Sequence, residues 1–249
     1  MKRVLITAGA SGIGLAMAQT FAATGAQVWV TDVDASALAA LPDGMRGTEA
    51  SVADEPAMAA LMAQVAADWG GLDVLCVNAG IKGPTSSITE TDLAAWRDCL
   101  AICLDGAFLT VKHGAPLMKA AGGAMIFTSS TAGIYGFPFR APYAAAKWAL
   151  IGLMKTAAME LGGFGIRCNA ILPGGVEGPR IEAVFAAEAA AKGMTRDQVY
   201  DGYAAGTALG CLVRAQDVAD AALYLASAPR VSGQTLAVDG FTINPDPKV

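Results

Sequence analysis

Charged residues are scarce in this chain of 249 residues. Asp, Glu, Lys and Arg make up 16% of it, against about 25% in an ordinary soluble protein. The formal net charge is −5, and no run of basic residues occurs. This composition argues against nucleic acid or an anionic membrane as a partner, because both are bound by clusters of Lys and Arg. Hydrophobic residues reach 54%, so we expect a large surface to be buried between subunits.

Metal-binding patterns are also missing. The cysteines are odd in number and lack metal-ligand spacing; they are Cys76, Cys99, Cys103, Cys168 and Cys211. We therefore expect no metal site, and free thiols in a reducing cytoplasm. Cys99 and Cys103 share one helical face, but two thiols do not make a metal site. The single histidine, His113, lies in a helical run, which favours a structural or solvent-exposed role over a catalytic one.

The chain shows no linker, internal repeat or low-complexity stretch. Strand patterns alternate with helical patterns from Val4 to Val238, which predicts one α/β domain over residues 1–249. An uncharged stretch, Ala120–Phe139, is long enough to raise the question of a membrane span. Its Gly, Ser, Thr and Pro content favours a strand followed by a loop.

A glycine-rich turn lies near the start of the chain. The apolar run Val4–Ile6 predicts a buried strand, and the turn Thr7–Gly14 leads from it into a helical pattern. Such glycines let the backbone approach a pyrophosphate, and the helix N-terminus offers free N–H groups. A second apolar strand ends at Asp32, where a carboxylate can accept hydrogen bonds from an adenine ribose. The alternative is a tight turn and a helix-starting Asp.

A tyrosine and a lysine stand four residues apart, at Tyr143 and Lys147, with Ser130 upstream. On a helix the two share one face, so the ammonium can favour the ionised phenol. A phenolate near neutral pH can take a proton from an alcohol, and Ser130 can hydrogen-bond the same oxygen. A solvated helix face produces the same Tyr–Lys pair by chance, so the pair gains its meaning from the glycine turn.

Three further blocks complete a pattern. They are Asn78-Ala79-Gly80 after an apolar strand, the segment Asn169–Gly174, and the segment Ser232–Gly240. Together the blocks resemble the short-chain dehydrogenase/reductase family over essentially the whole chain. The resemblance implies an α/β fold, a doubly wound parallel β-sheet of the Rossmann type with helices on both faces. It also implies a nicotinamide cofactor and a homotetramer.

The resemblance assigns roles to residues of this chain. Ser130, Tyr143 and Lys147 are the implied catalytic set. The implied cofactor-binding residues are Gly9, Ser11, Gly12, Ile13, Gly14, Asp32, Ser51, Val52, Asn78, Ala79, Gly80, Tyr143, Lys147, Pro173, Gly174 and Val176. The segment at about 175–209 is expected to form a variable lid over the substrate.

Four positions depart from the family pattern in the cofactor site. Ala8 replaces a glycine of the turn, and its methyl group is tolerated only if the backbone avoids positive φ. Ser51 stands where an Asp usually touches the adenine, and Val77 replaces a second Asn. Gly178 stands where a Thr commonly holds the nicotinamide amide.

The most consequential departure is Cys103, which replaces an Asn counted as a fourth catalytic residue. That Asn helps to place a water beside the lysine, and a thiol is a weaker donor and acceptor than an amide. A main-chain carbonyl at 103 can still hold the water, so the proton relay stays open. A nucleophilic thiol is disfavoured, because no His is near in sequence.

Three basic residues fall near the expected substrate site: Lys82, Arg140 and Arg180. Arg forks bind carboxylates bidentately, which favours an anionic hydroxy substrate such as a sugar acid. The alternative is solvated surface charge, with Glu177 neutralising Arg180. In the lid, residues 181–192 predict one helix, and Thr195 is expected to cap a second.

The expected activity is an NAD-dependent interconversion of a secondary alcohol and a ketone. Asp32 would repel the 2′-phosphate of NADP, and neither Val33 nor Ser11 supplies a compensating positive charge. The helix through Tyr143–Leu161 is apolar around much of its circumference, in keeping with a homotetramer. Two alternatives remain open: a 3-ketoacyl-type reductase, typically NADPH-dependent, and a non-catalytic NAD-binding redox sensor.

Overall fold

One parallel sheet organises the protein. The computed structural model describes residues 1–244, and residues 245–249 of the predicted 1–249 domain lie outside the described residues. Seven strands pair in the order β3-β2-β1-β4-β5-β6-β7. Their bounds are β1 Arg3–Thr7, β2 Gln27–Asp32, β3 Arg46–Glu49, β4 Val74–Val77, β5 Gly123–Thr128, β6 Ile166–Pro173 and β7 Thr235–Val238. All neighbouring strands are parallel, which confirms the predicted fold class.

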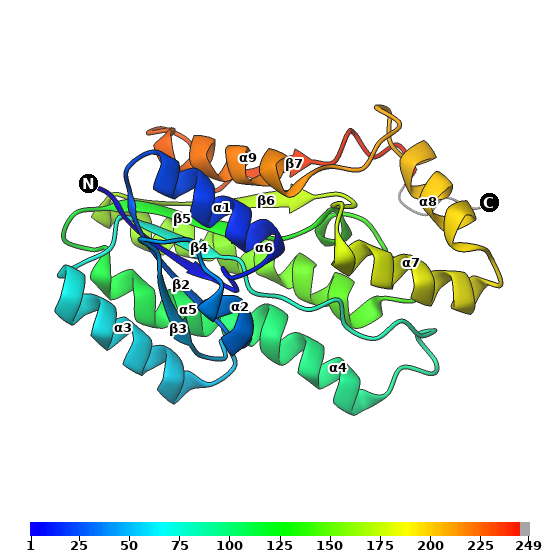
Figure 1. The fold of residues 1–249 in the computed structure, drawn as a ribbon, viewed down its shortest axis with the longest axis horizontal. Coiled ribbons are helices and arrows are strands. Elements are labelled where there is room, and N and C mark those ends of the chain that lie inside the picture. Colours follow the sequence, from blue (N-terminus) through cyan, green and yellow to red (C-terminus); the bar gives the residue numbers. More distant parts are fainter. Residues whose placement is uncertain (245–249) are drawn as a thin grey trace.

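Helices cover both faces of this sheet (Figure 1). In Figure 1, α1 and α9 lie on one side, and α3, α4 and α5 lie on the other. The helices are α1 Gly12–Ala23, α2 Ala35–Ala39, α3 Glu55–Trp69, α4 Leu93–Leu100, α5 Gly106–Gly114, α6 Ala141–Leu161, α7 Pro179–Lys192, α8 Arg196–Ala205 and α9 Ala215–Ser227. A π-helical turn, η1 (Ala101–Asp105), joins α4 to α5, and three short 3₁₀ turns occur elsewhere in residues 1–244.

A hydrophobic core lies on each face of the sheet, because successive side chains of a strand point to opposite faces. In β1, Val4 and Ile6 belong to the core beneath α1 and α9. Leu5, between them, points into the opposite core, which is packed by α3 and α6. Because both faces are buried, the central strands read as continuous apolar runs in the sequence.

The chain reverses its direction of winding between β1 and β4. Strands β1 to β3 progress toward one edge, and β4 to β7 progress toward the other. In doubly wound sheets, ligands bind outside the carboxyl ends of the strands at this point. The glycine turn, Asn78 and Ser130 follow directly on β1, β4 and β5, so the topology brings these predicted site residues to one edge.

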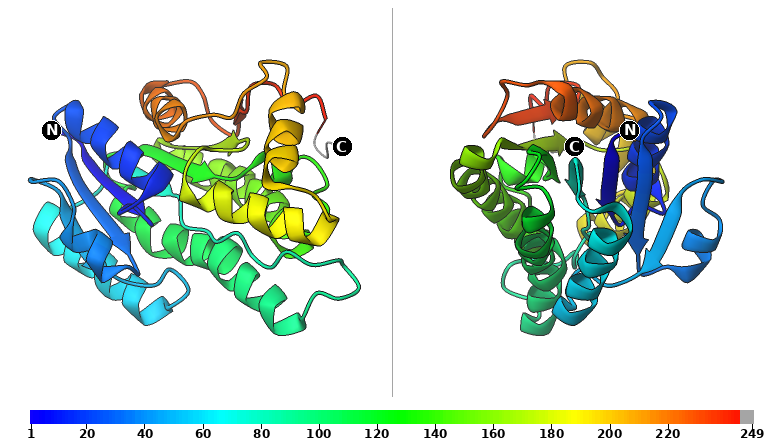
Figure 2. Two further views of the ribbon diagram at one scale, coloured as in Figure 1. Left: turned by 45° about the vertical axis from the view of Figure 1, so that its right-hand side comes forward. Right: turned by 90° about the vertical axis from the view of Figure 1, so that its left-hand side faces the viewer.

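Helices α7 and α8 form a corner beyond this edge (Figure 2, left view). Both helices were expected from the sequence, and Thr195 does cap α8 in a capping box with Gln198. Phe185 and Val199 pack the pair together. The buried Glu188 accepts a hydrogen bond of 2.6 Å from the Tyr203 hydroxyl. The predicted lid segment therefore has its own small core.

The uncharged stretch Ala120–Phe139 contains β5 and the short turn η3 (Thr131–Gly133). It is a strand followed by a loop, as its composition indicates. Within residues 1–244, no helix is both long and apolar enough to cross a membrane.

Candidate active site

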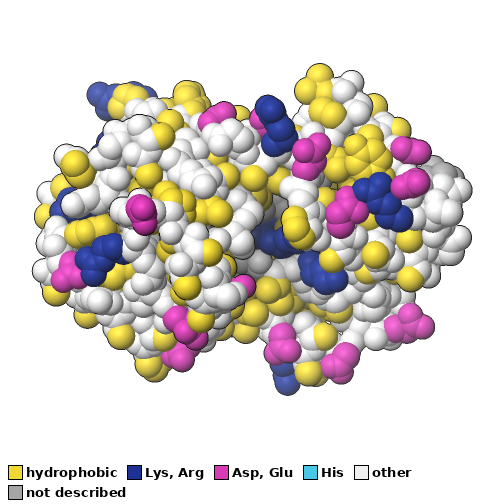
Figure 3. Space-filling view, in the orientation of Figure 1, with side chains coloured by type: hydrophobic (Ala, Val, Ile, Leu, Met, Phe, Trp, Pro, Cys, Tyr) yellow, Lys and Arg dark blue, Asp and Glu magenta, His cyan; other side chains and the backbone are white. Residues whose placement is uncertain are grey.

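A cavity of about 480 Å³ lies at the carboxyl edge of the sheet. Figure 3 shows the surface hollowed near its centre, with basic side chains in the hollow. The structure brings fourteen of the residues predicted for the site to its wall: Ser11, Gly12, Ile13, Gly14, Asn78, Gly80, Ser130, Arg140, Tyr143, Lys147, Pro173, Gly174, Val176 and Arg180. The other predicted residues, Gly9, Asp32, Ser51, Val52, Ala79, Lys82 and Cys103, do not line it.

The glycine turn leaves the N-terminus of α1 without a side-chain cap. Ser11 is the N-cap residue, and its hydroxyl makes no capping hydrogen bond. The first N–H groups of α1 are therefore available to a phosphate. Gly12 adopts φ of 51°, and a Cβ built there would meet no atom within 4 Å. At Gly14, by contrast, a Cβ would collide with the Ala8 carbonyl oxygen.

Ala8 adopts φ of 50°, the left-handed conformation that favours glycine. The condition for a harmless methyl group is therefore not met, and the methyl costs about 1 kcal/mol. The surrounding structure holds the strained residue: the Ala8 carbonyl accepts a hydrogen bond of 3.1 Å from Asn78 Nδ2. Strain of this kind persists only where the neighbouring contacts impose it.

Asn78 joins three strand ends. Its Nδ2 also donates to the Thr7 carbonyl at 3.0 Å, and its Oδ1 accepts from the Thr128 hydroxyl at 3.0 Å. Thr7 Oγ1 in turn accepts from the backbone N–H groups of Asn78 and Ala79. Asn78 therefore fixes the glycine turn relative to β4 and β5.

Asp32 lies at the end of β2, outside the cavity itself. Its Oδ2 accepts a hydrogen bond from the Ala10 N–H at 3.1 Å, and its Oδ1 accepts one from Val33 at 2.8 Å. Ser51 and Val52 precede α3. Ser51 Oγ accepts from Ala53, while Val52 is buried against the start of α5.

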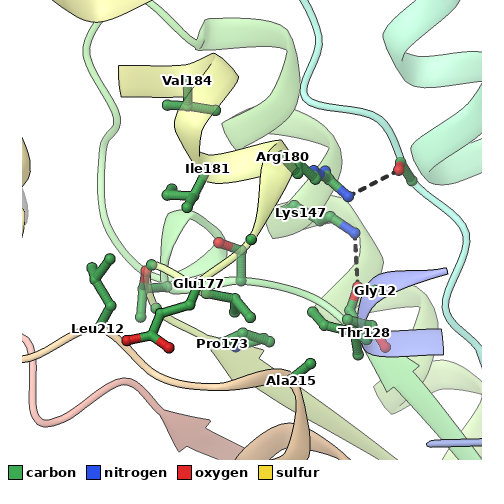
Figure 4. Close-up of a pocket in the computed structure, with 18 of the residues that line it drawn as sticks. Gly12, Thr128, Lys147, Pro173, Glu177, Arg180, Ile181, Val184, Leu212 and Ala215 are labelled. Carbon is green, nitrogen blue, oxygen red and sulfur yellow. Dashed lines mark hydrogen bonds between the residues drawn. The ribbon is translucent and has the colours of Figure 1, made fainter. Parts of the chain in front are cut away.

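Ser130, Tyr143 and Lys147 converge on the cavity, as the sequence predicts. Ser130 caps η3 through its hydroxyl, and Tyr143 lies in the first turn of α6. Lys147 follows one turn later on the same face; it is buried, and its Nζ donates to the Thr128 carbonyl at 2.7 Å. Figure 4 shows this bond, with the Lys147 and Arg180 side chains in the same wall.

The surroundings of Tyr143 favour its ionised form. Burial opposes ionisation, but the positive charges of Lys147, Arg180 and Arg140 outweigh it. A hydrogen bond with Ser130 acts in the same direction as the charges. The pKa of Tyr143 therefore lies below its ordinary value of 10.0. The site can hold a phenolate that accepts a proton from an alcohol.

Cys103 lies in the π-helical turn η1, fully buried and outside the cavity. Its Sγ accepts a hydrogen bond from the Ile81 N–H at 3.4 Å, and its thiol lies 3.5 Å from the Ile81 carbonyl oxygen. A hydrogen bond from Cys99 and the charge of Lys147 lower the pKa of the Cys103 thiol. The thiol supports the loop after β4 and does not reach the cavity, which disfavours a nucleophilic role.

The three basic substrate candidates take different places. Arg180 is exposed at the start of α7, and its Nη1 donates to the Gly80 carbonyl at 3.1 Å. Arg140 is buried, and Lys82 does not line the cavity with the other two. Among residues 1–244, no ion pair joins Glu177 to Arg180.

His113 and the cysteines take no part in a cluster of metal-ligating side chains within residues 1–244. His113 Nε2 lies 3.1 Å from a Glu55 carboxylate oxygen on the outer surface of α3 and α5, away from the cavity. The cysteines are unpaired, and no cluster of His, Cys, Asp or Glu in residues 1–244 could hold a metal ion. A cytoplasmic location stays a prediction.

Sequence reasoning missed the apolar wall of the cavity. Phe137, Ile181, Tyr203 and Leu212 line it, from the loop before α6, from the lid and from the loop before α9. The spacing of Ile181, Val184 and Phe185 in α7 was the available signal, since it marks an apolar helix face. The sequence around Phe137 does not indicate its place in the wall, because the residues that it contacts, such as Tyr203, come from distant segments.

Comparison with known proteins agrees with this geometry. A family model described as enoyl-(acyl carrier protein) reductase matches residues 7–241. The chain belongs to the short-chain dehydrogenase/reductase family. One relative of this dehydrogenase/reductase is cis-4-hydroxycyclohexanecarboxylate dehydrogenase of Sinomonas cyclohexanicum, 39% identical over 245 residues, which cover 95% of this chain and 94% of the relative.

Two further matches are similarly complete. (+)-Borneol dehydrogenase 1 of Salvia officinalis is 38% identical over 98% of this chain and 95% of its own length. The crystal structure of an NAD⁺-bound xylitol dehydrogenase aligns with a TM-score of 0.93 at 25% identity, covering 96% of this chain and 98% of that one. The chain is thus an oxidoreductase related to alcohol and hydroxy-acid dehydrogenases.

Proposed function

We propose that this short-chain dehydrogenase/reductase uses NAD(H) to interconvert a secondary alcohol and a ketone on a hydroxy acid. The observation that carries the proposal is the convergence of Ser130, Tyr143 and Lys147 on a cavity that the glycine turn also lines. The residues present fit a dinucleotide: α1 has an uncapped N-terminus, and Gly12 leaves open space before it.

The roles of the chain's own groups follow from their positions. The Tyr143 phenolate takes the proton of the substrate hydroxyl, and Ser130 holds the same oxygen by a hydrogen bond. Lys147 stabilises the phenolate through its charge. A nicotinamide cofactor, when bound, supplies the acceptor for the hydride that leaves the carbinol carbon. In ketone reduction, Tyr143 returns the proton.

The substrate class follows from the charges and from the apolar wall. Arg180 can hold a carboxylate at the cavity entrance. Three hydroxyls of the wall already donate within the protein: Ser129 Oγ donates to the Lys147 carbonyl, Tyr203 to Glu188, and Thr207 Oγ1 to the Ala204 carbonyl. The apolar side chains of Phe137, Ile181 and Leu212 favour a substrate body with few hydroxyls. An alicyclic or aliphatic hydroxy acid fits better than a sugar acid, as in the hydroxycyclohexanecarboxylate dehydrogenase relative.

Turnover with a substrate panel tests this proposal. The panel contains cis- and trans-4-hydroxycyclohexanecarboxylate, 3-hydroxybutyrate, gluconate and cyclohexanol, each with NAD. Preferred oxidation of the alicyclic or aliphatic acids is the expected result. Activity confined to a 3-ketoacyl thioester with NADPH would establish the ketoacyl reductase alternative instead. NAD binding without turnover of any compound would favour the redox sensor.

Preference for NAD over NADP is the expected cofactor specificity. A 2′-phosphate beside Asp32 would face a carboxylate, and Val33 supplies no positive charge to offset it. We expect kcat/KM for NAD to exceed that for NADP by at least about tenfold, which corresponds to roughly 1.4 kcal/mol. The preference should shrink in Asp32→Ala. Equal kcat/KM values for the two cofactors in the wild type would contradict this assignment.

A homotetramer is the expected assembly. Large apolar side chains stand exposed on neighbouring helices: Phe108 on α5 is 49% exposed, and Trp148 and Met159 on α6 are 53% and 85% exposed. Such a surface is typical of a protein–protein interface. Light scattering at micromolar concentration should give about four times the chain mass of 25.2 kDa. A monomer mass would rule the tetramer out.

A further inference from the structure

Arg140 is a buried charge with an incomplete set of partners. Arg140 is the N-cap residue of α6 and is 6% exposed. Nη2 donates to the Lys82 carbonyl at 2.8 Å, whereas Nε has no hydrogen-bond partner within residues 1–244. Burying a charged group with an unsatisfied N–H is costly. Fold stability alone therefore does not explain why the Arg140 guanidinium is buried here.

The guanidinium of Arg140 is stacked on the catalytic tyrosine. Its Cζ lies 4.4 Å from the centroid of the Tyr143 ring and 5.2 Å from that of Phe137. A guanidinium over an aromatic face is held there by the ring quadrupole. The guanidinium thus contacts the face of the Tyr143 ring, whose hydroxyl oxygen exchanges the proton.

Arg140 also belongs to a clamp on the loop after β4. Three side chains from different elements hold three consecutive residues of this loop by their main-chain atoms. Arg180 bonds the Gly80 carbonyl, Cys103 bonds Ile81, and Arg140 bonds the Lys82 carbonyl. Gly80 packs close to Lys147, since a Cβ built on it would lie 3.3 Å from Nζ. Arg140 therefore links the Tyr143 ring to the loop that flanks the catalytic lysine.

We propose that Arg140 is a positioning residue that fixes the Tyr143 ring and stabilises its phenolate, and that it does not bind the substrate carboxylate. The inference rests on the proposed function of Tyr143 as proton acceptor. The inference gives Arg140 and Arg180 different roles, although the sequence suggested both as ligands of a substrate carboxylate. A cation locked against the ring stays there whether or not an anionic substrate is bound.

The other groups facing Tyr143 explain why a second fixed cation is needed. Lys147 follows it on α6, Ser130 faces it from the end of β5, and Arg180 faces it from α7. Cys103, with Cys99 beside it, approaches Lys147 from the α4–η1 side. When a substrate carboxylate pairs with Arg180, the positive potential of Arg180 at the phenol falls. Arg140 and Lys147 then keep the pKa of Tyr143 low.

The test compares Arg140→Gln and Arg140→Lys with the wild type. Removing the cation should raise the pKa of Tyr143, so the acid limb of the kcat profile for alcohol oxidation should move to higher pH. We expect a move of about one pH unit or more in Arg140→Gln, with partial return in Arg140→Lys. The shift of the acid limb should be similar for acidic and neutral alcohols, and KM should change little.

Arg46→Gln is the matched control. Arg46 also stacks on an aromatic ring, with Cζ 3.7 Å from the Trp29 centroid, but it lies on β3 away from the cavity. Its loss should leave the pH profile unchanged. Thermal unfolding and NAD binding of each variant report whether the fold has survived.

Two results would overturn the inference. One is an Arg140→Gln enzyme whose pH profile matches that of the wild type. The other is a KM that rises for acids alone, which would make Arg140 a substrate ligand. If the wild type turns over no tested alcohol, the proposed function fails separately. The ultraviolet titration of Tyr143, taken as the difference from Tyr143→Phe, then still measures the effect of Arg140, and an unmoved titration refutes it.

Discussion

Replacing Tyr143 with phenylalanine is expected to lower kcat by at least about 100-fold, the usual contribution of a positioned proton-transfer group. The ring remains, so its packing against Arg140 should survive, while the oxygen that exchanges the proton is lost. NAD affinity should stay within a few-fold of the wild type. Steady-state turnover and cofactor titration measure the two quantities. Tyr224→Phe, at an exposed position on α9, serves as the control.

The pH dependence of the wild type has a definite sign. Alcohol oxidation needs the phenolate, so its rate falls as the pH drops through the pKa of Tyr143. Because that pKa lies below 10.0, activity should persist to lower pH than an unperturbed phenol would allow. Ketone reduction needs the phenol and should fall in the opposite direction. If Tyr143→Phe turned over at a rate comparable to the wild type, this mechanism would be wrong.

Replacing Arg180 with alanine is expected to lower kcat/KM for hydroxy acids by some 30- to 150-fold, or roughly 2–3 kcal/mol, because a bidentate charge-assisted pair is lost. A neutral alcohol of the same shape should lose only the support that Arg180 gives to the Tyr143 phenolate, so its fall in kcat/KM should be smaller. NAD affinity should hold, because Arg180 lies outside the glycine turn and away from Asp32. Initial-rate kinetics on matched acid and alcohol pairs give the comparison.

Two variants sharpen this test. Arg180→Lys keeps the charge but loses the planar fork, so it should recover part of the activity on acids. Arg196→Ala removes an arginine of the same lid that pairs with Glu182 outside the cavity; it controls for a general disturbance of α7 and α8. The anionic-substrate proposal fails if the wild type prefers neutral alcohols, or if Arg180→Ala behaves as the wild type on acids.

Local features of the site were predictable because they depend on neighbouring residues. The strand, glycine turn and α1 follow one another directly, and Tyr143 and Lys147 share a face through the helical repeat alone. The cap of α8 is equally local, with Thr195 and Gln198 three residues apart. Each of these features appears in the structure where the sequence placed it.

Other features depend on residues far apart in the chain. The left-handed backbone of Ala8 is held by Asn78, seventy positions later. Arg140, which the sequence suggested as a substrate ligand, is buried, and its guanidinium contacts the Lys82 carbonyl and the Tyr143 ring. Propensity and spacing carry no information on such contacts, because they form only when β1, β4 and α6 come together.

The sequence by itself determined the alternation of strands and helices, the glycine turn, and the shared helix face of Tyr143 and Lys147, since hydrophobic period, glycine chemistry and helical spacing are written in adjacent residues. The doubly wound sheet was implied by the resemblance to the family. Only the tertiary structure decided which of the two arginines near the cavity is buried and which is exposed. Arg140 and Arg180 lie forty positions apart and look equivalent in the sequence. Packing turned one inward against the phenol ring and left the other at the cavity entrance, because burial is set by the assembled layers and not by the residue type.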